Sequence, residues 1–295
     1  MAFPGTAEGP SRRPYLQEFF IIEQRGSGKL DIIVCVKQVL DHDIPPRDFK
    51  VDEENLTVVP PSNVSPVISN FDEYAIEEAI ILKEAHGGKI TVVTAGGDSA
   101  RDLLKKCLAM GCDEAVLLQD ESFDGSDSFG IARILAGAIQ KIGAFDIILC
   151  GRISSDWSQG TTSLALAEAL DLPSVSQLIK IEVNGNALRC ERVLEDGEEV
   201  VEVTTPCLLT TSNEINSPRL PSVKGILMAS RKQIPVWGAG DIGVDPAAVG
   251  AGASTLELTK LYKPNLGSQC EFIEADSLEE AADKLGDRLR EDKII

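Results

Sequence analysis

The segment from Asp146 to Pro173 carries the densest group of residues that could do chemistry. It reads as a short apolar strand, then a polar turn, then a helix. At the end of a parallel strand, such a turn directs backbone N–H groups and hydroxyls toward the positive end of a helix dipole. The pattern therefore predicts an anion or nucleotide site, although an ordinary helix N-cap would use the same residue types. The polar turn residues are Ser154, Ser155, Asp156, Ser158, Gln159, Thr161 and Thr162.

Composition limits the functions that the chain can have. It has 295 residues, of which 43% are hydrophobic, so it can bury a sizeable core. Its formal net charge of -19 argues against a nucleic-acid partner or an anionic membrane surface, because Lys and Arg neutralise phosphates in such contacts. No apolar run reaches the ~20 residues that a membrane-spanning helix needs.

Cysteine and histidine usage indicates a reducing compartment and argues against a metal site. The seven cysteines form no C-x-x-C pair, and most lie in apolar contexts, as the reduced core thiols of a cytosolic protein do. With only two histidines, His42 and His86, the chain has little material for imidazole catalysis or zinc binding. We therefore expect a cytoplasmic protein without a metal, or one of the mitochondrial matrix if it is eukaryotic.

Apolar runs alternate with segments of helical period over the first half of the chain. This alternation predicts an α/β fold in which right-handed crossovers build a parallel sheet covered on both faces. The expected strands are residues 30–36, 89–94, 115–118 and 147–150, and the expected helices are residues 72–86, 100–110 and 127–142.

The helix predicted from Asp72 to His86 has a clear apolar stripe. Its polar positions are expected to face water. Gly87-Gly88 then ends the helix as a C-terminal cap requires. The residues expected in water are Glu73, Glu77, Glu78 and Lys83.

After Pro173 the pattern changes to short alternating runs joined by Asn-Gly and Asp-Gly turns, which predicts an antiparallel meander. Residues 213–237 hold three prolines and several basic residues, and no element is predicted there. A final helix is expected at residues 277–291, with Leu278, Leu285 and Leu289 on one stripe. The predicted organisation is an extension (1–29), a nucleotide-binding core (30–244) and a C-terminal arm (245–295).

Several segments together resemble the β subunit of electron transfer flavoprotein, in matching order from Leu30 to the C-terminus. The run Val36 to Val39 is similar to that family's opening strand, and Cys107 to Asp113 resembles its A-L-A-M-G-A-D segment. Asn216 to Arg219 is similar to its N-E-P-R segment, and Gly151 to Pro173 to its nucleotide loop and helix.

The resemblance implies a Rossmann-like, doubly wound parallel sheet, of the adenine-nucleotide α-hydrolase-like kind, with an added meander and a C-terminal arm that packs on a partner. It implies a non-enzymatic subunit of a heterodimer. The α subunit would hold the redox-active FAD, and this chain would hold AMP or, in electron-bifurcating members, a second FAD. Electrons would pass from flavin dehydrogenases, such as the acyl-CoA dehydrogenases of fatty acid oxidation, to a membrane quinone reductase or another acceptor.

Carried over by position, the nucleotide contacts would be Cys35, Ser69, Asn70, Ala95 and the loop from Ser154 to Thr162, which includes Trp157 and Gly160. Two departures stand out. Ser69-Asn70 replaces the family's Asn-Pro, and the loop matches the D-G-D-T-A-Q-V-G sequence of bifurcating members poorly. Trp157 in place of Gly could crowd a flavin or stack on one.

The family layout also implies positions for redox partners. Phe71 and His42 would lie near the flavin of the α subunit, although a core aromatic and a solvated loop residue are equally good interpretations. Ile215 falls where the family has an apolar anchor for partner dehydrogenases, and an exposed aliphatic on a Pro-bordered loop suits that role. An inward-facing loop residue is the alternative.

Two other functions remain open from the residues alone. A stand-alone adenine-nucleotide sensor could use the same fold, but the meander and the arm would then have no explanation. A nucleotidyl transferase or hydrolase would need an S-G-G-x-D-S-like phosphate loop near its start, which the chain lacks.

Overall fold

The computed structural model describes residues 29–41, 43–264 and 270–295. The chain forms two compact units. The larger unit contains residues Pro60–Glu257 together with the described residues up to Phe49, and the smaller contains Lys50–Val59 and the described residues from Leu258 onward. The predicted extension (1–29) and His42 lie outside the described residues, apart from Lys29.

The larger unit is built on a nine-stranded sheet with the order β11-β10-β9-β12-β8-β1-β6-β7-β13. Strand β1 lies at its centre, parallel to β6 and β8. Strand β9 is parallel to β12 and then continues as the first strand of the antiparallel meander. The strands are β1 (Ile32–Cys35), β6 (Ile90–Ala95), β7 (Glu114–Leu118), β8 (Ile147–Gly151), β9 (Ser174–Asn184), β10 (Ala187–Leu194), β11 (Gly197–Thr204), β12 (Cys207–Thr211) and β13 (Val236–Trp237).

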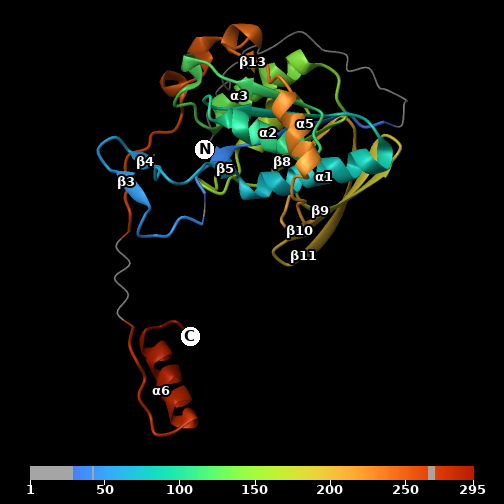
Figure 1. The fold of residues 1–295 in the computed structure, drawn as a ribbon. Coiled ribbons are helices and arrows are strands. Elements are labelled where there is room, and N and C mark those ends of the chain that lie inside the picture. The colour runs from blue at the N-terminus through green and yellow to red at the C-terminus, as the bar shows by residue number, and fades with distance from the viewer. Residues whose placement is uncertain (1–28, 42, 265–269) are drawn as a thin grey trace, which may run out of the picture. The chain divides into compact units, whose positions relative to one another are not determined.

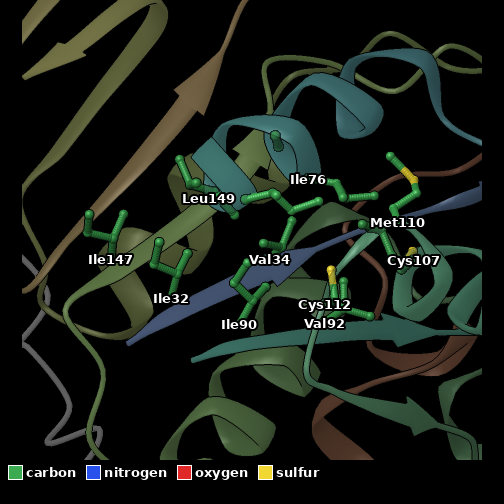
Figure 2. Packing of buried hydrophobic residues seen from close by; sticks show 14 of the residues in the cluster. Ile32, Val34, Ile76, Ile90, Val92, Cys107, Met110, Cys112, Ile147 and Leu149 are labelled. Atoms are coloured by element: carbon green, nitrogen blue, oxygen red, sulfur yellow. The ribbon is translucent and has the colours of Figure 1, made fainter. Parts of the chain in front are cut away.

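Helices cover both faces of this sheet, as the near-continuous apolar strands require. One hydrophobic cluster joins the sheet to α1 (Asn70–His86), α2 (Ala100–Met110) and α5 (Val223–Arg231). The other joins it to α3 (Ser128–Ile142) and α4 (Thr162–Ala169). Figure 1 shows the helices around the sheet, and Figure 2 shows strand residues of the first cluster packed with Ile76 of α1. The predicted α/β class and parallel sheet are confirmed.

Shorter elements complete the larger unit. Strands β2 (Gln38–Val39) and β5 (Val67–Ile68) form an antiparallel pair. Four short 3-10 helices lie at Glu121–Phe123, Ala239–Asp241, Pro246–Ala248 and Ala251–Ala253.

Helix α5 was not predicted from the sequence. Its start is fixed by Ser222, whose hydroxyl accepts a hydrogen bond from the Gly225 N–H at 3.0 Å. The helix has only nine residues and lies between prolines at positions 221 and 235. Its helical period is therefore too short to stand out in the sequence.

The larger unit continues to Glu257, beyond the boundary near Val244 that the sequence suggests. Hydrogen bonds hold the additional residues to the start of α3. The Thr255 N–H and hydroxyl both donate to Asp127, at 2.7 Å, and Arg133 donates to the Ala248 carbonyl at 3.0 Å. These partners are more than a hundred residues away along the chain, so local patterns do not reveal them.

The smaller unit contains the hairpin of β3 (Lys50–Asp52) and β4 (Thr57–Val59), and helix α6 (Leu278–Glu291). Ser277 caps α6 by accepting a hydrogen bond from the Glu280 N–H. Of the apolar stripe that the sequence predicts on α6, Leu278 and Leu285 are exposed, Leu278 at 91%, and Leu289 is half-buried. None of the helices in the described ranges is long and apolar enough to span a membrane.

Candidate functional site

The candidate site lies at the carboxyl ends of β1 and β8, where the strand order reverses. From β1 the chain adds β6 and β7 on one side, and β8 and β12 lie on the other. In open α/β sheets, ligands bind at such a switch point. Lys37 lies two residues after the end of β1, and Gly151 ends β8, so the predicted loop begins at this point.

The loop after β8 is tied to the start of α1. The Ser155 N–H donates to the Ser69 hydroxyl at 3.2 Å, and the Asn70 N–H donates to the Ser155 hydroxyl at 3.3 Å. Lys37 forms a salt bridge with Asp156 at 2.6 Å. The structure therefore brings together Ser69, Asn70 and the first half of the predicted loop.

The second half of the loop is tied to α3 and to itself. Gln159 accepts a 2.6 Å hydrogen bond from the Ser128 hydroxyl at the start of α3. The hydroxyls of Ser158 and Thr161 donate to loop carbonyls. Trp157 is 48% exposed, and its side chain stands on the outer part of the loop. The expected strand, polar turn and helix are all present, with α4 beginning at Thr162.

Helices α1, α2 and α4 begin without a side-chain cap. Helix α2 follows the carboxyl end of β6, α4 follows the loop after β8, and the start of α1 is tied to that loop. In the part of the chain that the structure describes, Ser69, Ser99 and Thr161 stand at the N-caps of α1, α2 and α4 and make no capping hydrogen bond. By contrast, Asp127 and Ser222 do cap α3 and α5. Uncapped N–H groups at a helix start favour an anion. At α2 the first three N–H groups already donate to backbone carbonyls, and at α1 the Asn70 N–H donates to Ser155, so the start of α4 is the one of the three that best fits a nucleotide phosphate.

A buried carboxylate, Asp72, joins the two central strands and was missed by the sequence reasoning. It accepts the Lys37 N–H at 2.8 Å and the Gly151 N–H at 3.1 Å. Burial raises the pKa of Asp72 to about 7, against the lowering effect of these two hydrogen bonds. A Cβ on Gly151 would lie 2.5 Å from Asp72 Oδ1, so only glycine allows this close approach. In the sequence, the signal that could have pointed to Asp72 was its position in the first turn of a predicted helix.

Lys37 and Asp156 supply the charge at the loop. Burial favours the neutral acid at Asp156, but hydrogen bonds from Lys37 and Ser154 outweigh it and hold the pKa of Asp156 below its ordinary value. Both side chains of this salt bridge are partly exposed, so it contributes little to stability, and its main effect is to place Lys37 beside the loop. Lys37 was a second residue that the sequence reasoning missed.

Cys35 and Ala95 lie at the ends of β1 and β6. Cys35 is paired in register with Cys150 of β8, and a hydrogen bond between the two thiols together with burial raises the pKa of Cys150. Ala95 is two positions beyond Val93, the register partner of Cys35. Both predicted residues therefore share the carboxyl edge of the sheet with the loop.

Phe71 is half-buried at the start of α1, and the Arg152 guanidinium lies 4.8 Å from its ring centre.

Ile215 differs from its predicted exposure: it is partly buried and packs against the first hydrophobic cluster.

A cavity of about 390 Å³ lies beside the loop, next to α4. It is lined by Arg152, Ile153, Gly160, Ser163, Leu164, Ser176, Gln177 and Thr210.

Comparison with known proteins decides the family. The family model of the electron transfer flavoprotein domain matches residues 58–242, more than half of the chain. The chain belongs to the electron transfer flavoprotein family. It is 38% identical over 267 residues to the electron transfer flavoprotein subunit beta of Thermoanaerobacterium thermosaccharolyticum, covering 90% of this chain and 100% of that relative.

Two further relatives extend this similarity. The chain is 36% identical over 230 residues to the electron transfer flavoprotein subunit beta of Bacillus subtilis, covering 78% of this chain and 88% of the relative. It is 35% identical over 265 residues to the caffeyl-CoA reductase-Etf complex subunit CarD of Acetobacterium woodii, covering 90% and 99%. Membership of the electron transfer flavoprotein family gives the chain a role in electron transfer, and similarity to β subunits implies an α subunit as partner.

For this member of the electron transfer flavoprotein family, Asp72 gives a pH prediction. Below about pH 4 its carboxyl is neutral in both the folded and the unfolded chain. As the pH rises toward about 7, the unfolded chain loses the proton first, so the free energy of unfolding decreases, by up to about 4 kcal/mol. Asp72→Asn should remove this decrease. Because Asn has one acceptor oxygen for two N–H donors, the variant should be less stable than the wild type at low pH, and the difference should shrink as the pH rises.

The measurement is the urea-unfolding midpoint of the purified heterodimer at about pH 5 and about pH 8. Asp98→Asn, which changes a largely exposed carboxylate, is the matched control and should keep the wild-type pH dependence. An Asp72→Asn profile parallel to the wild type would contradict the role of Asp72.

Proposed function

We propose that the chain is the β subunit of a heterodimeric electron transfer flavoprotein that binds AMP as a structural nucleotide. The heterodimer would carry electrons between flavin dehydrogenases of the acyl-CoA dehydrogenase type and a quinone reductase or another acceptor. The observation that supports a nucleotide most strongly is the uncapped start of α4 together with the polar loop before it, which Lys37 reaches at the strand-order switch.

In this proposal the chain's own residues bind and orient, and they carry no chemical step. The hydroxyls and N–H groups of the loop from Ser154 to Thr162 would hold the phosphate, with Lys37, which pairs with Asp156 of that loop, as a nearby cation. Ser69 and Asn70 would lie beside the adenosine, and Cys35 and Ala95 would line the strand ends. The FAD on the α subunit supplies the electron-transfer chemistry, and Phe71 and His42 are proposed to lie near it.

The first test identifies the nucleotides that the heterodimer holds. We expect one FAD and one AMP per heterodimer, because the loop lacks the sequence of bifurcating members and carries Trp157 in place of Gly. Acid extraction followed by chromatography of the released nucleotides measures this. Two FAD and no AMP would overturn the AMP assignment and favour an electron-bifurcating subunit with its second FAD on this chain.

A second test concerns the cation of the site. Lys37→Met removes the charge that holds Asp156 and would face the phosphate. A hydrogen bond to a charged group contributes about 1.5 to 3 kcal/mol, so AMP affinity should fall roughly tenfold to a hundredfold. Calorimetric titration of nucleotide-depleted heterodimer measures the affinity.

The matched control for Lys37→Met is Lys89→Met. Lys89 is exposed to a similar degree, 46% against 45%, and also pairs with a carboxylate, but it precedes the amino end of β6. AMP affinity should be unchanged in the control. Equal losses in both variants would show that Lys37 acts through general stability or net charge and not at a nucleotide site.

Partner recognition is proposed to lie on α5 and on Leu220, three residues before it. Between Ile215 and Gly240 the chain has four basic residues and no acidic one, although its net charge is -19. The large apolar side chains here face solvent, which suits an apolar pocket bordered by carboxylates on a flavin dehydrogenase. Ile215, the residue expected from the sequence, is partly buried instead. The exposed residues are Leu220, Val223, Ile226, Leu227 and Met228.

The third test truncates one of these side chains. Leu227→Ala should weaken the complex with a partner dehydrogenase by about tenfold or more, since an apolar anchor contributes roughly 2 kcal/mol. Flavin spectrum and nucleotide content should stay as in the wild type. Leu256→Ala, which has similar exposure elsewhere on the unit, is the control. If Ile215→Ala weakens the complex with the dehydrogenase and leaves the stability of the heterodimer unchanged, then Ile215 is the anchor, as expected from the sequence.

The C-terminal arm is proposed to pack on the α subunit, because Leu278 and Leu285 of α6 are exposed in the smaller unit. The six buried free cysteines support a reducing compartment, so the cytoplasm, or the mitochondrial matrix in a eukaryote, remains the proposed location.

A further inference from the structure

Helix α1 carries two consecutive buried carboxylates, Glu77 and Glu78, each 5% exposed. The sequence pattern predicts both in water, so the structure corrects that expectation. Buried carboxylates are rare unless they are paired. Their partners come from the segment before α5, about 140 residues further along the chain.

Glu77 is held by Arg219 through four hydrogen bonds. Arg219 Nε donates to the two carboxylate oxygens at 3.0 and 2.9 Å, and its Nη2 donates to Oε1 at 2.9 Å. The Arg219 backbone N–H donates to Oε2 at 3.0 Å. A forked guanidinium on a carboxylate fixes direction as well as distance, and lysine cannot reproduce it.

The outer side of the Arg219 guanidinium is held by Glu84, two turns further along α1. Arg219 donates to Glu84 Oε1 at 2.6 Å and to Oε2 at 3.1 Å. These hydrogen bonds, first from Glu84 and then from Glu77, raise the pKa of Arg219. Glu84 is 59% exposed, whereas Glu77 is buried, so Glu77 provides the shielded half of the clamp.

A second contact holds the same segment next to Glu77. The Asn216 side-chain amide donates to the Tyr74 carbonyl and to Glu78, both at 3.1 Å. Burial raises the pKa of Glu78, and the hydrogen bond from Asn216 opposes this. With Pro218 between the two contacts, the segment has little freedom before α5 begins.

Helix α5 itself contributes little to its own placement. Its single buried residue is Ala229, and a Cβ on Gly225 would lie 2.2 Å from the Ala109 carbonyl oxygen of α2. Small residues therefore let α5 lie close to α2 (Figure 1). No large side chain of α5 is buried in the core. After the helix, Lys232 donates to the Asp113 carbonyl. The orientation of α5 depends on the contacts at its two ends.

We propose that Glu77 is a positioning residue for partner recognition: by holding Arg219 it fixes the orientation of α5 and of its exposed apolar side chains. This inference rests on the proposed docking role of α5. Glu77 touches neither the nucleotide loop nor the exposed face of α5 in the described structure, so its effect reaches the partner only through Arg219.

The test replaces Glu77 in the purified heterodimer. Glu77→Gln keeps the shape of the side chain but places an amide NH₂ against the donors of Arg219. Hydrogen exchange of residues 216–231 should become faster, and the complex with a partner dehydrogenase should weaken about tenfold, because the docking segment must be ordered on binding. FAD and AMP content should not change.

Two further variants make the test specific. Glu84→Gln removes only the exposed half of the clamp and should weaken the complex less than about threefold. If Glu77→Gln does not fold, Arg219→Lys takes its place, since it keeps the charge and removes the fork. Unchanged exchange of residues 216–231 in the variant that folds would overturn the proposal.

Leu227→Ala separates this proposal from the function on which it rests. If Leu227→Ala weakens the complex and Glu77→Gln loosens α5 without weakening it, Glu77 does not position the docking surface and the proposal is wrong. If Leu227→Ala leaves the complex intact, α5 is not the docking surface, and both the recognition proposal and the role of Glu77 in it are overturned.

Discussion

The buried carboxylate of Asp72 is the constraint on which the proposed nucleotide site depends. It accepts one N–H from Lys37, two residues after β1, and one from the last residue of β8, so it joins the start of α1 to both central strands. The same close approach requires Gly151. Lys37 and the loop after Gly151 are thereby fixed beside each other, and the salt bridge to Asp156 follows from that placement.

Much of the larger unit could be predicted from local pattern. Strands buried on both faces read as continuous apolar runs, and helices α2 and α3 were predicted within one residue of their observed bounds because their apolar period is clear. The loop from Ser154 to Thr162 was also predicted, since a strand, a polar turn and a helix leave a local signature. These features depend only on neighbours in the chain.

The features that the sequence did not reveal depend on distant partners. Glu77 has the spacing of a solvent-facing residue, and its burial is possible only because Arg219 reaches it. Helix α5 and the burial of Ile215 likewise depend on α1 and α2, which are more than a hundred residues earlier. Asp72 looks like an ordinary acid in the first turn of a helix, and only the sheet shows that it joins two strands.

Helix α1 therefore links the two regions for which a function is proposed. Its first turn carries Asp72 at the strand ends, and its next turns carry Glu77 and Glu78, which hold the segment before α5. Both regions share one 17-residue helix packed into the same hydrophobic cluster. A ligand that binds only the folded state stabilises whatever folds with it. A structural nucleotide at the start of α1 would thus support the docking segment at its side, which gives a nucleotide without redox chemistry a physical role in an electron carrier.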